Sequence, residues 1–155
     1  MTDRAVSTAM GYALVLGIVT LLTTGLVMGF APLVTGQQAD ATHSTLEVLG
    51  NDLAGDVESV DHLAAAAGSD GTVVLRSRLP ERVGGSGYHI EIDEANETDG
   101  NQRYEIRLRS TDPETIATVG FRTQIEVDDD ATGTLDGGPL EITYDGERLV
   151  VREDE

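Results

Sequence analysis

The sequence has 155 residues and carries 28 Asp and Glu against 10 basic residues, for a net charge of −18, with no cysteine. The missing cysteine excludes disulfides, thiol catalysis and Cys-ligated metal sites. The acidic excess argues against a nucleic-acid partner, because phosphate binding uses clustered Lys and Arg. Acidic and apolar residues are interleaved, so we interpret the acids as the surface of a folded protein from a high-salt environment. At 1 M salt the Debye length is about 3 Å, which screens the self-repulsion of such a surface.

An uncharged and largely apolar segment follows the first five residues and predicts a transmembrane helix over residues 6–34. No charged residue lies between Arg4 and Asp40. At ~1.5 Å per residue the stretch 8–30 would be roughly 34 Å long, enough to cross a bilayer. A cleaved secretory signal fits poorly, because its apolar core is usually about 7–15 residues long. Two interpretations stay open: an uncleaved signal anchor, and a prepilin-type leader followed by a retained helix.

The junction between the polar start and the apolar segment favours the prepilin type. Arg4-Ala5-Val6-Ser7 resembles the site that archaeal prepilin peptidases cut, and with the glycine-bearing helix behind it the N-terminus resembles pilin-like proteins of halophilic archaea. The resemblance implies that residues 1–5 are a leader, cleaved between Ala5 and Val6 by a prepilin peptidase-like enzyme. It also implies a helix that anchors in the lipid membrane and contacts other pilin-like subunits. Met10 stands where bacterial type IV pilins usually have Glu, at the fifth mature position, which favours a minor or accessory subunit.

The apolar segment also carries a motif for close helix packing. Gly25 and Gly29 are four residues apart and share one face, and small residues there let two backbones approach in lipid. Hydroxyl groups that could bond across helices are supplied by Thr8, Thr20 and Thr24. Gly25 and Gly29 are therefore the candidate helix-packing residues.

After an expected bend at Gly36-Gln37-Gln38, residues 41–67 predict an amphipathic helix. Its apolar face recurs at spacings of three and four residues: Leu46, Leu49, Leu53, Val57, Val60, Leu63 and Ala67. The opposite face carries acids, among them Asp61, which we expect in solvent. Gly50 and Gly55 each cost up to about 1 kcal/mol relative to Ala, so this helix should depend on packing.

From residue 71 the apolar period changes to two, which predicts a small antiparallel β domain over residues 71–155. Two neighbouring antiparallel strands would turn one face inward: Tyr88, Ile90 and Ile92 on the first, and Tyr104, Ile106 and Leu108 on the second. One strand or two over residues 116–127 would carry a bulge at Gly120. The expected fold class is α+β: a long N-terminal helix, membrane-spanning and then amphipathic, followed by a small antiparallel β-sheet or sandwich.

The end of the chain predicts a β-hairpin. Asp145-Gly146 is a signal for a two-residue turn. Closing the hairpin there pairs Ile142 with Leu149 and Leu140 with Val151, so that apolar side chains meet on one face.

Orientation in the membrane follows from the short N-terminal side. Arg4 and the amino terminus fit the positive-inside rule, which predicts a single-pass protein with a cytoplasmic N-terminus and an extracellular C-terminal domain. Asn96-Glu97-Thr98 is a glycosylation sequon, in a stretch that reads as a polar exposed loop. Asn96 is therefore the glycosylation candidate.

The sequence shows no arrangement of residues typical of catalysis, of a cofactor or of a metal site. His43, His62 and His89 share no metal-ligand spacing, and Asp128-Asp129-Asp130 reads as a solvated turn rather than a cation site. We therefore expect no enzyme. The favoured function is a pilin-like exported subunit of a cell-surface structure. The alternative is an uncleaved single-pass domain with an adhesion or envelope role.

Overall fold

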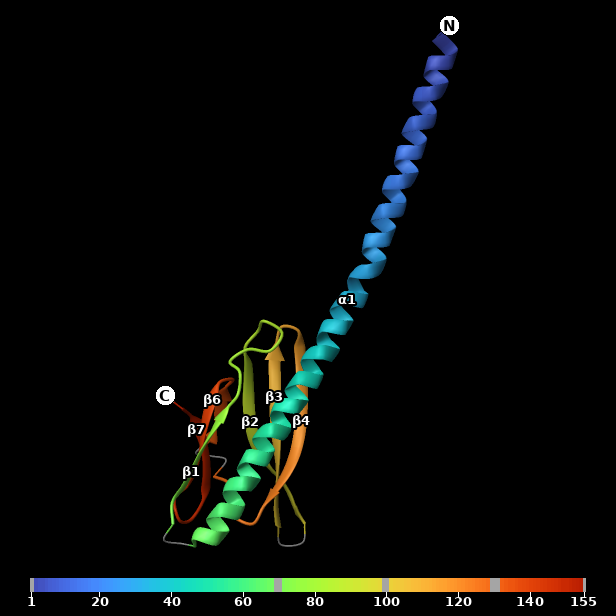
Figure 1. Ribbon diagram of the computed structural model, residues 1–155. Coiled ribbons are helices and arrows are strands. Elements are labelled where there is room, and N and C mark those ends of the chain that lie inside the picture. The colour runs from blue at the N-terminus through green and yellow to red at the C-terminus, as the bar shows by residue number, and fades with distance from the viewer. Residues whose placement is uncertain (1, 69–70, 99–100, 129–131, 155) are drawn as a thin grey trace. The chain divides into compact units, whose positions relative to one another are not determined.

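The computed structural model describes residues 2–68, 71–98, 101–128 and 132–154, except the side chains of residues 2–9, 29–35, 96–98 and 101. The chain divides into two compact units, Met1–Gln37 and Gln38–Glu155. Figure 1 shows the helix α1 and the strands that follow it. The elements are α1 (Thr2–Ala67), β1 (Val73–Arg78), β2 (Tyr88–Thr98), β3 (Asn101–Thr111), β4 (Glu114–Thr123), β5 (Thr134–Asp136), β6 (Pro139–Tyr144) and β7 (Leu149–Glu153).

The helix α1 is assigned without interruption from Thr2 to Ala67. The helix is therefore not interrupted at Gly36-Gln37-Gln38, where a break or bend was expected. The division between the two units nevertheless falls at Gln37. A glycine inside a helix lowers its stability by about 1 kcal/mol but removes no backbone hydrogen bond, so it need not end the helix.

In the second unit, α1 buries one face against the β strands. Its buried residues recur as the 3.6-residue period requires: Thr42, Leu46, Gly50, Leu53, Val57, Val60 and Ala64. Helix and sheet approach closely at Gly50, where an added Cβ would lie 2.8 Å from Val119 Cγ2 and 2.9 Å from Leu108 Cδ1. Gly50 therefore allows α1 to pack closely against the sheet. This agrees with the prediction that this helix depends on tertiary contacts.

Three members of the predicted helix faces were wrong, among them Ala67, which was expected on the apolar face and is exposed. Leu63 was expected in the core and is 54% exposed, whereas Asp61 was expected in solvent and is 2% exposed. The observed stripe advances by 3.6 residues on average and reaches Ala64 in place of Leu63. Asp61 is buried because its carboxylate accepts backbone N–H groups just after β4, from Gln124 at 3.0 Å and from Ile125 at 2.9 Å.

The strands form two antiparallel sheets, so the predicted α+β class is confirmed. One sheet has the order β4-β3-β2-β5 and the other β1-β6-β7. The predicted neighbours pair as expected, with Ile90 opposite Leu108 and Ile92 opposite Ile106. Their inward side chains form the core with α1, and Tyr104 stacks on Phe121 with ring centroids 5.5 Å apart.

Two expectations about the four-stranded sheet were wrong. Gly120 lies in an unbroken register with β3, opposite Glu105, so it forms no bulge. The irregularity lies between Ala95 and Thr98 in the pairing of β2 with β3. Asn96 was expected in a loop, but the backbone of β2 continues through it to Thr98, because cross-strand pairing resumes between Thr98 and Asn101.

The final hairpin forms, but its register differs from the prediction by two residues. Ile142 pairs with Val151 and Tyr144 with Leu149. The turn is wider because the Asp145 carboxylate accepts the backbone N–H of Glu147 at 3.0 Å and of Arg148 at 3.1 Å. These bonds, first that from Arg148 and then that from Glu147, lower the pKa of Asp145 below its ordinary value of 3.8. A shift of two residues leaves every side chain on its predicted face.

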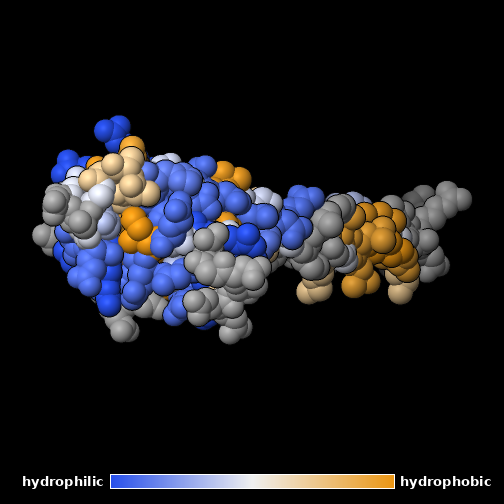
Figure 2. All heavy atoms as spheres, turned by 90° about the horizontal axis from the view of Figure 1, so that it is seen from below, coloured by the Kyte–Doolittle hydropathy of each residue, from blue (hydrophilic) through white to orange (hydrophobic). Residues whose placement is uncertain are grey.

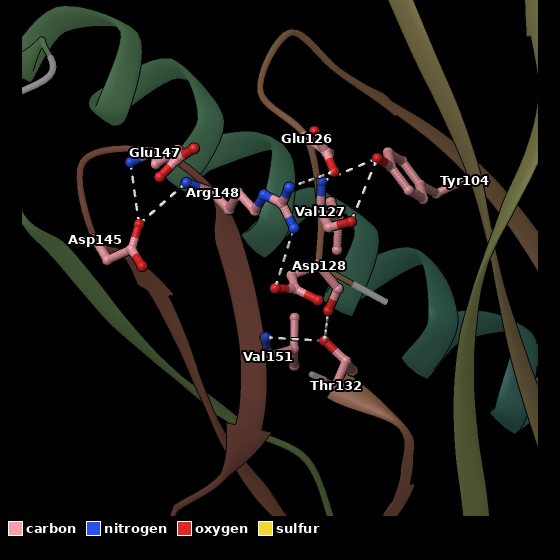
Figure 3. A network of polar contacts seen from close by, with 9 residues as sticks. All are labelled: Tyr104, Glu126, Val127, Asp128, Thr132, Asp145, Glu147, Arg148 and Val151. Carbon is pink, nitrogen blue, oxygen red and sulfur yellow. Dashed lines mark hydrogen bonds and ion pairs between the residues drawn. The ribbon is translucent and has the colours of Figure 1, made fainter. Parts of the chain in front are cut away.

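A polar network joins the two sheets, as Figure 3 shows. Leu149 exchanges backbone hydrogen bonds with the segment after β4, accepting from Asp128 N at 2.8 Å and donating to Glu126 O at 2.9 Å. The Arg148 guanidinium lies 3.5 Å from a carboxylate oxygen of each of these acids. The Tyr104 hydroxyl accepts the N–H of Val127 at 2.9 Å. The start of β7 is thus tied to β3 through this segment.

Candidate functional site: the exposed apolar helix

The most unusual surface of the protein lies on α1 in the first unit. The segment Met10–Met28 has 19 residues, is apolar and long enough to cross a membrane, and none of its residues is buried in the protein. Leu21 is 75% exposed and Met28 73%. In Figure 2 hydrophobic side chains gather on this helix, whereas the visible face of the second unit is mainly hydrophilic. Exposed apolar surface on this scale marks a membrane or protein contact.

The threonine hydroxyl groups of this segment already form hydrogen bonds within the helix. Thr20 donates to Leu16 O at 2.8 Å, Thr23 to Val19 O at 2.9 Å and Thr24 to Thr20 O at 2.8 Å. These bonds satisfy donors that would be costly to leave unpaired in an apolar medium. Thr20 and Thr24, which were expected to be able to bond across helices, thus donate within their own helix and keep only acceptor capacity for a neighbour. Thr8 lies outside the residues with described side chains.

The helix-packing candidates are only partly described. Gly25 lies on the exposed helix, and an added Cβ would meet nothing within 4 Å. Gly25 is therefore free of contacts in the single chain and open to a neighbouring helix. Gly29 lies within α1, but its surroundings are outside the described residues.

The leader junction and the sequon are placed by backbone alone. Arg4, Ala5 and Val6 lie in the first turns of α1, which begins at Thr2, and their side chains are outside the described residues. Asn96 lies within β2, and its side chain is also outside them. The predictions of cleavage and of glycosylation therefore concern side chains outside the described residues.

The second unit holds a shallow groove of about 350 Å³ between β2 and β5. There His89, on the outer face of β2 as predicted, lies 2.7 Å from Asp136 through Nδ1. The neighbouring Tyr88 donates its hydroxyl to Pro80 O at 2.7 Å, and burial raises the pKa of Tyr88 to about 12. The pair His89–Asp136 fastens the short edge strand β5 to the sheet.

The residues the structure describes contain no group of three His, Asp or Glu that could hold a metal ion. Asp128 pairs with Arg148, while Asp129 and Asp130 lie outside the described residues. Sequence reasoning missed Asp61, whose three N–H contacts fix α1 to the sheet, because an Asp on the polar side of a helix gives no signal of burial.

Comparison with known proteins yields one family. No curated protein and no solved structure matches the chain. The match to a family covers residues 1–152, almost the whole chain. The protein therefore belongs to the family of unknown function DUF7266.

Proposed function

We propose that the protein is a pilin-like, membrane-anchored subunit of a cell-surface structure, minor or accessory in its assembly, and non-catalytic. The observation that supports the proposal is that two parts of α1 have different surroundings: the first is exposed and apolar, and the second packs in the core of the second unit. One helix supplies an exposed, predominantly apolar segment of 19 residues at Met10–Met28 and, further on, the helical part of the β unit's core. Such a helix both anchors and presents a folded domain.

The proposed topology places the amino terminus in the cytoplasm and the second unit outside the cell. The single basic residue before the apolar segment, Arg4, supports this orientation under the positive-inside rule. Export would expose Asn96 to glycosylation. The acidic excess and the absence of lysine support a high-salt environment of the kind in which halophilic archaea live.

The leader junction supplies the direct test. Amino-terminal sequencing of the protein from its native cells should give a mature start at Val6, the product of cleavage by a prepilin peptidase-like enzyme. Arg4→Ala should leave the uncleaved form in the membrane. A matched change at Asp3, one residue away, should leave cleavage intact. A native protein that keeps residues 1–5 would overturn the pilin-like assignment.

The alternative function is an uncleaved single-pass domain with an adhesion or envelope role. Met10 is compatible with it, because the acidic residue that bacterial type IV pilins carry at this position is missing. Retained residues 1–5, together with surface exposure of the second unit to added protease, would establish this alternative.

A further inference from the structure

The two sheets of the second unit each end in a strand with an open edge. β1 and β4 are end strands, whereas the other two end strands, β5 and β7, are linked by the bond from Asp136 N to Glu153 Oε1 at 2.8 Å. Within the described residues, no hydrogen bond from outside its sheet reaches the backbone of β1. On β4, α1 covers only the last turn of the strand, where Glu58 approaches the N–H of Arg122 at 3.5 Å. An open edge presents unpaired N–H and C=O groups to which another strand can bind.

On β1, the residues whose backbone faces the open side also have exposed side chains. The carbonyl of Pro139 accepts the N–H of Asp154 at 3.0 Å, so Pro139 faces β7 and not β1. Arg78 lies opposite Pro139, and two directly opposed residues of an antiparallel pair either face each other or both face away. Arg78 therefore faces the open side, and alternation gives Val74 and Arg76 the same direction. All three side chains are exposed.

The same holds for β4. Arg122 directs its N–H toward α1 and away from β3. By alternation Glu114, Ile116 and Thr118 also direct their backbone groups to the open side, and their side chains are exposed. An antiparallel pair of β1 with β4 can therefore form its hydrogen bonds while both outer surfaces stay on one face of the joined sheet.

Each open edge carries an apolar side chain that the fold leaves in solvent. Val74 on β1 is 53% exposed and Ile116 on β4 is 42% exposed. Among the large exposed hydrophobic residues of the described part of the chain, these two alone lie on strands, and the others lie on α1. Both belong to the residues that face an open edge.

The charges beside these two apolar residues are opposite in sign. The next two outward positions after Val74 are basic, and the two before Ile116 are acidic: Arg76 and Arg78, and Asp112 and Glu114. Within the described residues Arg78, Asp112 and Glu114 take part in no ion pair. Arg76 contacts two acids of its own sheet, but its side chain stays 66% exposed. One edge thus offers basic charge without a partner, and the other offers acidic charge without a partner.

We propose that β1 of one copy of the chain adds to the open edge of β4 of a second copy, antiparallel and with Val74 opposite Ile116. The same register matches the neighbouring positions: Thr72 with Thr118, Arg76 with Glu114, and Arg78 with Asp112. Opposite charges, apolar pairs and Thr–Thr pairs directly across two strands each stabilise a sheet. A shift of two residues in one direction would put Arg76 opposite Ile116. A shift in the other direction would put Val74 opposite Glu114.

This register selects a second copy as the partner. β1 requires an open antiparallel edge with an apolar residue that follows two acids at alternate positions, and residues 112–118 of the same sequence supply it. The two surfaces differ, so the contact is heterologous, and such contacts propagate into rings or open filaments. The contact rests on the proposed function for the existence of an assembly, and it adds which surfaces meet.

Cysteine cross-linking tests the contact directly, because the natural chain has no cysteine. Full-length Val74→Cys/Ile116→Cys, treated with a short bismaleimide in native membranes at molar salt, should give a ladder of cross-linked oligomers. Opposed residues of an antiparallel pair lie about 5 Å apart, within reach of the reagent. Val74→Cys/Ser59→Cys, with the second thiol at an exposed position of α1, is the matched control and should stay monomeric. Absence of the ladder, or dimers of either single variant, would overturn the pairing of β1 with β4.

A proline variant tests the backbone part of the contact in the double-cysteine protein. The N–H of Thr118 faces the open side, so Thr118→Pro removes a donor that β3 does not use, and proline is tolerated at such positions. The ladder should fall by at least about tenfold, while tyrosine fluorescence of the folded unit stays unchanged. Thr118→Val keeps the N–H and should keep the ladder. A ladder that Thr118→Pro leaves unchanged would overturn strand addition.

Charge reversal tests the register in the same background. Arg78→Asp and Asp112→Arg should each lower the ladder by at least about tenfold, because like charges would then be juxtaposed. The two changes together should restore it, and Arg82→Asp, an exposed arginine beyond β1, should have no effect. Loss without rescue would overturn the register. The mature N-terminus in the same membranes reports on the proposed function separately: a ladder from chains that keep residues 1–5 would support the contact and overturn the pilin-like assignment.

Discussion

The carboxylate of Asp61 on α1 accepts the backbone N–H of Ile125 at 2.9 Å, across 64 positions of sequence. The same carboxylate accepts the N–H of Gln124, and Glu58 one turn earlier approaches the N–H of Arg122 at 3.5 Å. These donors lie at and just beyond the end of β4, on the edge strand of its sheet. Unpaired N–H groups on an edge strand invite pairing with another chain, and covering the edge with a helix prevents this.

Removing the Asp61 carboxylate should therefore destabilise the second unit strongly. Asp61→Ala leaves buried N–H groups unsatisfied, and we expect a loss of about 2–3 kcal/mol in the free energy of unfolding. Urea unfolding of the full chain in a nonionic detergent, followed by tyrosine fluorescence, measures it. Glu47→Ala, at an exposed acid on the same helix, should stay within about 0.5 kcal/mol of wild type. Equal midpoints for the two variants would refute the structural role of Asp61.

The fold class and the inward faces of the strands could be predicted from the sequence. The contacts that set the register of the final hairpin and cover the edge of the sheet could not. Alternation placed Ile90 and Leu108 inward because burial of one sheet face dictates a period of two. The hairpin register was missed because the Asp145 side chain, not backbone bonds alone, builds the turn. Asp61 and Gly120 were misjudged for a common reason. Their roles depend on a neighbour distant in the chain, and a local pattern contains no information about it.

The two glycines of the amphipathic part of α1 should respond in opposite ways to the same change. Gly55→Ala meets no neighbour and should raise stability by about 0.5–1 kcal/mol through helix propensity alone. Gly50→Ala puts a Cβ within 3 Å of Val119 and Leu108 side-chain atoms, and overpacking should cost about 1–2 kcal/mol. Urea midpoints of the two variants at low protein concentration give the comparison. A stabilising Gly50→Ala would show that the helix does not sit as close to the sheet as described.

The turn at Asp145 should make part of the stability depend on acid pH. Since backbone N–H groups lower the pKa of the folded Asp145, its ionised form stabilises the fold at pH values above the ordinary value of 3.8. That contribution is lost as the pH falls through the lower folded value. Asp145→Asn removes the charge, so the stability difference between wild type and variant should be present at neutral pH and vanish in strong acid. Measuring the difference cancels the titration of the other acids. A difference independent of pH would contradict the role of the charge.

Contact between apolar helices should depend on Gly25. Its surroundings are open, and Gly25→Leu should leave membrane insertion intact while reducing self-association in a membrane-helix reporter assay. Gly29→Leu should act alike, because both residues share one face. Gly17→Leu is the matched control, since Gly17 is equally open but has no glycine four residues away. If Gly25→Leu, Gly29→Leu and Gly17→Leu all self-associate to the same extent in the reporter assay, the four-residue spacing of Gly25 and Gly29 has no role in helix contact.

Low ionic strength should loosen the second unit. The net charge of −18 belongs almost entirely to residues beyond the apolar segment, and at millimolar salt the Debye length reaches about 30 Å or more, so the acids repel one another across the whole unit. The full chain in nonionic detergent should unfold at a lower urea concentration in millimolar than in molar potassium chloride. Sodium chloride at the same ionic strength should protect equally well, because screening does not depend on the identity of the ion. If only millimolar calcium raised the urea midpoint, the protein would have a specific cation site. If the urea midpoint were the same at millimolar and molar salt, the screening argument for a high-salt habitat would be wrong.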